Sequence, residues 1–180
     1  MKNNRFLNPL TAAGCLSGLA SCIFLYAPLP GGIGLNFLPG IFFGVALCIA
    51  FIFILKQTVS SAKVLGVILV SSAAYYIAVY STLNLGSSAD GSIGIGCFFV
   101  GGMIGALILL LGIIFLLKPL RIYQIFLLTV LDGILGMVGW QSNFANSNDP
   151  SLFLLCLVWQ GGMAFALALC FGWNEKRSRS

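Results

Sequence analysis

Long apolar stretches alternate with short polar ones along the whole chain. A transmembrane helix needs about 20 mostly apolar residues to cross about 30 Å of hydrocarbon, and six stretches meet this requirement. They cover residues 9–27, 36–55, 64–85, 92–117, 122–140 and 151–173. None shows the period-two alternation of a barrel strand, and lipid offers an irregular backbone no hydrogen-bond partner. The pattern predicts an all-α, polytopic transmembrane helical bundle with six spans, forming a single domain over residues 1–180 with a short basic tail at 174–180.

The polar connections divide into two chemically different groups. Residues 28–36, 86–92 and 141–150 are rich in Gly, Pro, Asn and Ser, as turns require, and contain no Lys or Arg. All nine Lys and Arg residues lie on the other side of the predicted bundle. By the positive-inside rule, both termini are therefore expected in the cytoplasm and the protein in the cell membrane (inner or plasma membrane).

The composition supports the same class of protein. Hydrophobic residues make up 59% of the chain and charged residues only 7%, against roughly 25% charged residues in an ordinary soluble domain. No segment remains for a separate water-soluble domain. The formal net charge of +5 comes from residues at the ends of the spans, so it predicts contact with lipid headgroups and not with nucleic acid.

One carboxylate, Asp132, interrupts this apolar pattern in the fifth predicted span, within the stretch "TVLDGILGMVGW". At about 1.5 Å per residue it lies about 12 Å from the outer end of its span, and Gln160 of the next span comes at about 14 Å. Tyr75 and Tyr76 of the third span fall at about the same depth. The same count adds Ser17, Gly101 and Gly102 to this level. The sequence thus predicts a polar, Gly-rich layer near the middle of the bilayer.

The predicted spans contain no Lys, Arg or His that could neutralise Asp132. An ionised carboxylate at a helix centre costs roughly 2.5 to 3.5 kcal/mol even on the lenient insertion scale, so such groups face protein or a water-filled cavity and find partners. The candidate partners are Gln160, Tyr75, Tyr76 and Thr129, or a bound water or cation. Two interpretations stay open: a neutral carboxyl that joins two helices through a hydrogen bond, or an exchangeable proton or cation site.

Catalytic and metal-binding chemistry has little support in the sequence. Histidine is absent, no second carboxylate lies within a span, and neither GxSxG nor HExxH occurs. The six cysteines lie in apolar stretches without a CxxC pair, and such cysteines pack as small apolar groups. We therefore expect no enzyme, no metal site and no cofactor.

Small residues spaced four apart predict close helix packing. Such pairs occur at Gly14 and Gly18, at Gly40 and Gly44, and at Gly101 and Gly105. In lipid, small-xxx-small lines allow the backbones of two helices to approach closely. A compact bundle is expected. Aromatic residues at span ends fit the interfacial belt, but Trp159 should lie well inside the sixth span, away from that belt.

Two short stretches resemble known sequence patterns. Leu19 to Cys22 ("LASC") resembles a lipoprotein lipobox, but the apolar "IFLYAP" that follows favours retention of the first span. The segment "LNFLPGIFFGVAL" slightly resembles the corresponding region in the substrate-binding subunits of energy-coupling-factor vitamin transporters, which are also six-span proteins. No substrate motif carries over, so this likeness identifies no family.

The sequence as a whole favours a membrane protein that binds or translocates a small solute, proton or cation at Asp132, Gln160, Tyr75 and Tyr76. The alternative is a non-catalytic structural or assembly subunit of a larger membrane complex, or of a homo-oligomer. Glycine-lined faces suit that alternative equally well.

Overall fold

The computed structural model describes residues 6–25, 37–54, 58–85, 94–117, 120–144 and 153–177, and within these ranges the chain is helical with no strand. The helices are α1 (Leu7–Leu25), α2 (Leu38–Ile49), α3 (Ser61–Leu85), α4 (Ile95–Leu116), α5 (Ile122–Phe144) and α6 (Phe153–Arg177). A single π-helical turn, η2 (Ala50–Ile54), extends α2. The prediction that the fold is all-α is therefore confirmed for the described residues.

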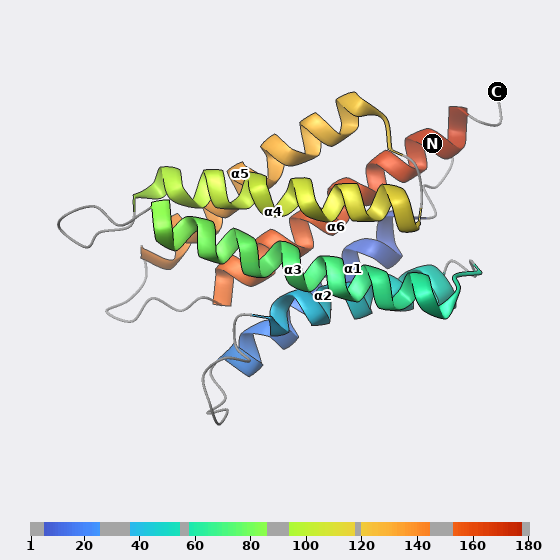
Figure 1. Cartoon of the computed structure of the whole chain (residues 1–180), viewed down its shortest axis with the longest axis horizontal. Helices are drawn as coiled ribbons and strands as arrows, with labels where there is room; N and C mark the ends of the chain where they lie inside the picture. Colours follow the sequence, from blue (N-terminus) through green and yellow to red (C-terminus); the bar gives the residue numbers. More distant parts are fainter. Residues whose placement is uncertain are drawn as a thin grey trace.

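Successive helices run in opposite directions, and α1 begins at the same end of the bundle at which α6 ends (Figure 1). Lys63 in the first turn of α3 and Arg121 just before α5 mark this end by their charge, so we call it the basic end. The other end is called the opposite end. Odd-numbered helices run from the basic end to the opposite end, and even-numbered helices run back.

Each helix packs against its neighbours in sequence, and α1 also packs extensively against α6, so the six helices form a closed ring. Side chains of α6 reach further, to α3 and to the first turn of α2. Of the apolar 18-residue stretch that could span a membrane, 67% is buried within the molecule in α6, whereas the share in α3 is 22%. Helix α6 is therefore the most buried of the four long apolar helices, and α3 is the most exposed of them.

The predicted small-residue lines lie in the seams between helices. A Cβ added at Gly18 of α1 would come within 2.8 Å of Leu157 Cα on α6, and one added at Gly44 of α2 within 2.8 Å of Ile68 Cα on α3. Gly105 of α4 faces Ala78 of α3 in the same way. These contacts are possible only without a side chain, which explains the need for glycine and confirms the expected close packing.

Four helices are long and apolar enough to cross a membrane, as judged by length and composition: Ser61–Leu85, Ile95–Leu116, Ile122–Gly139 and Leu155–Asn174. Leu7–Ile23 and Leu38–Phe53 are shorter apolar helices. This composition is compatible with a membrane protein. Helix α5 continues to Phe144, into the segment that was expected to be the loop 141–150. The expected turns at 28–36 and 86–92, and residues 145–150 of the third, lie outside the described residues.

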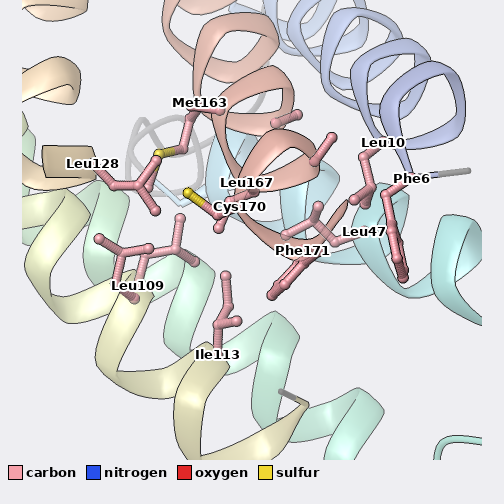
Figure 2. Close-up of a cluster of buried hydrophobic side chains, with 14 of the residues drawn as sticks. Phe6, Leu10, Leu47, Leu109, Ile113, Leu128, Met163, Leu167, Cys170 and Phe171 are labelled. Atoms are coloured by element: carbon pink, nitrogen blue, oxygen red, sulfur yellow. The ribbon is translucent and has the colours of Figure 1, made fainter. Parts of the chain in front are cut away.

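The apolar core lies mainly in the half of the bundle next to the basic end. Figure 2 shows side chains from several helices meeting there, among them Leu109, Leu128, Met163, Leu167 and Phe171. Phe171 also makes aromatic contacts with Phe6 and Phe51, with ring centroids 5.9 and 5.6 Å apart. This core ends near the level of Asp132, where the buried side chains become more polar.

Candidate functional site

Asp132 lies near the middle of α5 and is completely buried. The indole Nε1 of Trp159 donates a hydrogen bond to its Oδ2, with 2.5 Å between the two atoms. The other oxygen, Oδ1, has no hydrogen-bond partner among the described residues. Burying a polar atom without a partner costs about 1 to 3 kcal/mol, so this oxygen marks a place where a proton or a small polar group would be stabilised.

Helix α4 holds the backbone of Asp132 from the other side. A Cβ added at Gly102 would come within 2.8 Å of the carbonyl oxygen of Asp132 and 3.2 Å of Gly133 Cα. Phe99 and Met103 of α4 cover Gly133. The approach of α4 is therefore apolar and glycine-dependent, and it offers the carboxylate no charged group.

Trp159 connects Asp132 to a chain of side chains that leads toward the opposite end. The ring of Tyr75 on α3 packs against Trp159 at a centroid distance of 5.5 Å, and the Tyr75 hydroxyl lies 4.0 Å from Cys156 Sγ. The thiols of Cys156 and Cys22 are hydrogen-bonded to each other, which joins α6 to α1. We call these five residues the Asp132 cluster.

Gln160, the neighbour of Trp159, belongs to a separate hydrogen-bond network. Its Oε1 accepts a hydrogen bond of 2.7 Å from Ser17, and its Nε2 donates to Ser21 Oγ at 3.0 Å and to the Pro39 carbonyl at 3.1 Å. The single hydroxyl hydrogen of Ser17 is shared between Gln160 Oε1 and the Gly14 carbonyl, and Ser21 donates its own to the Ser17 carbonyl. Both amide hydrogens and the carbonyl oxygen of Gln160 are thus satisfied, and this side chain fastens α6 to α1 and α2.

The structure brings together only part of the predicted site. Asp132 and Tyr75 share the Asp132 cluster, whereas Gln160 bonds to α1 and α2 and makes no hydrogen bond to Asp132. Tyr76 points outward and stacks on Phe37 and on Tyr80, with centroid distances of 4.6 and 6.2 Å. It therefore lies on the surface of the bundle, apart from the cluster.

Three members of the cluster, Trp159, Cys156 and Cys22, were not predicted as site residues. For Trp159, the position inside the sixth apolar stretch, away from the usual interfacial belt, was the available signal, because a buried indole N–H needs an acceptor. Cys22 and Cys156 were expected to be apolar packing residues, and both are indeed buried. Their contact with each other and with Tyr75 depends on which faces of α1, α3 and α6 meet.

Thr129 is the second buried polar group of α5 without a partner. Its Oγ1 makes no hydrogen bond among the described residues, and it precedes Asp132 by three residues on the helix. Residues three apart lie on neighbouring positions of a helix surface. Two unpartnered oxygens, a hydroxyl and a carboxyl, therefore occupy the same side of α5.

A second polar pair lies at the basic end. Gln124 of α5 and Asn174 of α6 exchange two hydrogen bonds of 3.0 and 3.2 Å, and Gln124 also caps the backbone N–H of Arg121. Gln124 and Asp132 are separated by about 12 Å along the axis of α5. Leu128, which is fully buried, lies between them.

The described residues contain no group of three or more His, Cys, Asp or Glu side chains that could hold a metal ion. Comparisons with protein-family models, with curated proteins and with solved structures find no match. The chemistry of the site therefore has to be inferred from the arrangement of its own residues.

Proposed function

We propose that the protein is a six-span membrane protein of the cell membrane, with cytoplasmic termini, that binds or translocates a small solute or ion by means of a proton exchanged at Asp132. The observation that carries this proposal is the buried carboxyl itself, which has one oxygen on an indole N–H and the other without a partner. Intramembrane carboxyls of this kind commonly mark ion paths and proton relays.

The surroundings of Asp132 favour a proton over a metal cation. An N–H donor directed at Oδ2 suits a carboxyl or a carboxylate but repels a cation. Hard cations such as Ca²⁺ and Mg²⁺ take six or more oxygen ligands, and the described side chains around Asp132 provide few oxygens. A proton, in contrast, can be bound by Oδ1 alone. The protonated carboxyl would then be neutral, as a buried site without a countercharge requires.

The rival hypothesis, a non-catalytic subunit of a membrane complex, has less support from the packing. It depends on glycine-lined faces that are free to meet a partner protein. The glycines of the predicted lines contact other helices of the same chain, whereas Gly94 and Gly96, at the start of α4, would place a Cβ in open space. No enzymatic activity is proposed, because the described residues place no second carboxyl beside Asp132 and the sequence contains no histidine.

Labelling by a hydrophobic carbodiimide tests the protonation of Asp132, because this reagent modifies protonated carboxyl groups within membranes. The protein would be purified, reconstituted in liposomes, labelled over a range of pH and analysed by peptide mass spectrometry. We expect Asp132 to be modified at low pH and progressively less as the pH rises. Asp132→Asn should abolish this labelling. A carboxyl that is labelled equally across the whole pH range, or not at all, would contradict an exchangeable proton.

Transport is tested in the same liposomes by the flux that a pH gradient drives, with a panel of small solutes and a pH-sensitive dye inside. Wild-type protein should couple solute and proton movement, and Asp132→Asn should abolish the coupling. Thr82→Val is the matched control: Thr82 is also a buried polar residue, and it bonds to the Ala78 carbonyl in the α3–α4 seam. A fully active, correctly folded Asp132→Asn variant would overturn the proposal.

A further inference from the structure

Buried groups on the two sides of Asp132 differ in their ability to pass a proton. Toward the opposite end lie the Tyr75 hydroxyl and the thiols of Cys156 and Cys22, which form one connected series. Cys156 is three residues from the start of α6 and Cys22 three residues from the end of α1, so the series reaches within about one turn of the helix ends. Each of these groups can accept a proton while it releases its own.

Toward the basic end, the bundle is filled by the apolar core. Leu128 and Leu167 are completely buried and Met163 is 1% exposed, and Figure 2 shows Met163 directed toward Leu128. The core comprises residues of all six helices that present almost only hydrocarbon and sulfur. Such a layer contains no chain of hydrogen-bonding groups, so it blocks proton movement.

Among the described residues, the titratable and charged groups toward the basic end include Cys48, Cys170, Tyr123, Lys63 and Arg121. Cys48 is buried in α2, and its thiol donates to the Val64 carbonyl at the start of α3. Tyr123 is half exposed in the first turn of α5. The core contains one thiol, Cys170, which is about 16 Å along α6 from Trp159. Arg121 lies about 16 Å along α5 from Asp132, and Lys63 is in the first turn of α3. Thr129, three residues before Asp132, is the nearest protic side chain along α5, but its hydroxyl has no described partner that would continue a path toward the basic end.

We propose that Asp132 exchanges its proton with the opposite end of the bundle, with Cys156 and Tyr75 as relay residues, while the core around Leu128, Met163 and Leu167 seals the basic end. This inference rests on the proposed function, because it assumes that Asp132 exchanges a proton. The relay needs no oxidant or cofactor. The indole of Trp159 keeps its hydrogen, so a water molecule has to carry the proton between the Tyr75 hydroxyl and Oδ1 of Asp132. Each relay group gains one hydrogen and loses one, and only Asp132 changes its protonation state.

Trp159 provides an optical probe of this exchange because its indole donates to Asp132. In a Trp140→Phe, Trp173→Phe variant it is the remaining tryptophan. This variant, carrying a terminal affinity tag, would be reconstituted in liposomes and sorted by orientation through capture of the tag. A stopped-flow pH jump applied outside the vesicles then reaches either the opposite end or the basic end first, and the fluorescence of Trp159 reports when Asp132 responds.

We expect the response from the opposite end to be at least about tenfold faster than the response from the basic end, a factor that corresponds to about 1.4 kcal/mol of barrier. Cys156→Ala and Tyr75→Phe should slow it, and Cys156→Ser, which keeps a protic group, should restore it. Cys170→Ala is the matched control in the core and should leave the rate unchanged. Leu128→Ser should accelerate the response from the basic end.

Equal rates from the two ends, or a faster response from the basic end, would overturn the sidedness while leaving the proton site intact. A response that persists in Asp132→Asn, or no response from either end, would overturn the proposed function itself. The two failures are therefore distinguishable in one experiment. A rate that Cys156→Ala leaves unchanged, or a slower rate that Cys156→Ser does not restore, would contradict the relay role.

Discussion

Replacement of Gly102 by alanine tests whether α4 and α5 meet at Asp132 as closely as the structure describes. The new Cβ would lie 2.8 Å from the Asp132 carbonyl oxygen and 3.2 Å from Gly133 Cα, both below the 3.4 Å at which ordinary contact begins. All the nearest atoms belong to the α5 backbone, which cannot rotate away as a side chain would. The two helices must therefore separate at this point.

The size of the effect follows from two opposing terms. Overpacking by one methyl group in a well-packed interior costs about 1 to 3 kcal/mol, and alanine recovers up to about 1 kcal/mol through its higher helix propensity. Gly102→Ala should thus lower the free energy of unfolding by up to about 3 kcal/mol, and by about 1 to 3 kcal/mol relative to a glycine-to-alanine change that meets no clash. The matched control is Gly96→Ala on the same helix, where the added Cβ meets nothing within 4 Å and stability should stay equal or rise.

The assay is unfolding of the purified protein in mixed micelles with increasing dodecyl sulfate, followed by far-ultraviolet circular dichroism. Tryptophan fluorescence in the single-Trp159 variant gives a second readout, because a shift of α5 at Asp132 alters the hydrogen bond to the indole. If Gly102→Ala is as stable as Gly96→Ala, the α4–α5 seam is looser than described, and the burial of Asp132 would have to be reconsidered.

Two further predictions concern the partners of Asp132 and the closure of the ring. In double-mutant cycles, Asp132→Leu should couple to Trp159→Phe by about 0.6 to 1.7 kcal/mol and to Gln160→Leu by less than about 0.5 kcal/mol. The reason is that, of these two residues, Trp159 is the one that bonds to the carboxylate. Unfolding free energies of the single and double variants measure both couplings, and a larger coupling to Gln160 than to Trp159 would refute the prediction. Mild oxidation should join Cys22 and Cys156 in a disulfide, detected by peptide mass spectrometry, and reduced thiols throughout would contradict the α1–α6 contact.

The helices and their seams could be predicted from the sequence because both depend on local patterns. Apolar stretches of sufficient length become helices, and glycines four residues apart lie on one side of a helix. The pairs Gly14 and Gly18, and Gly40 and Gly44, accordingly lie in the α1–α6 and α2–α3 seams. Helix ends were less accurate: α5 passes the predicted end by several residues, since polar residues near an interface can continue a helix.

The level of the polar layer was also predictable, but the direction of each side chain was not. Counting residues gives height along a helix, and Ser17 does bond to Gln160 as the common depth implied. Successive residues, however, point about 100° apart. Trp159 and Gln160 differ by one residue, as do Tyr75 and Tyr76, and in each pair only one side chain joins the Asp132 cluster. Which one does so depends on how all six helices pack.

Gln160 and Asp132 show why depth alone does not separate structural from functional polar residues. Both are completely buried polar side chains near the middle of the bundle. Gln160 has a partner for each donor and for its acceptor, so any change at its site removes hydrogen bonds and gains none. Asp132 keeps one oxygen unpaired, with protic groups on one side and an apolar core on the other. A side chain whose donors and acceptors are all paired holds helices together. A carboxyl with an unpaired oxygen, at the boundary between protic groups and an apolar core, retains the capacity to take up and release a proton.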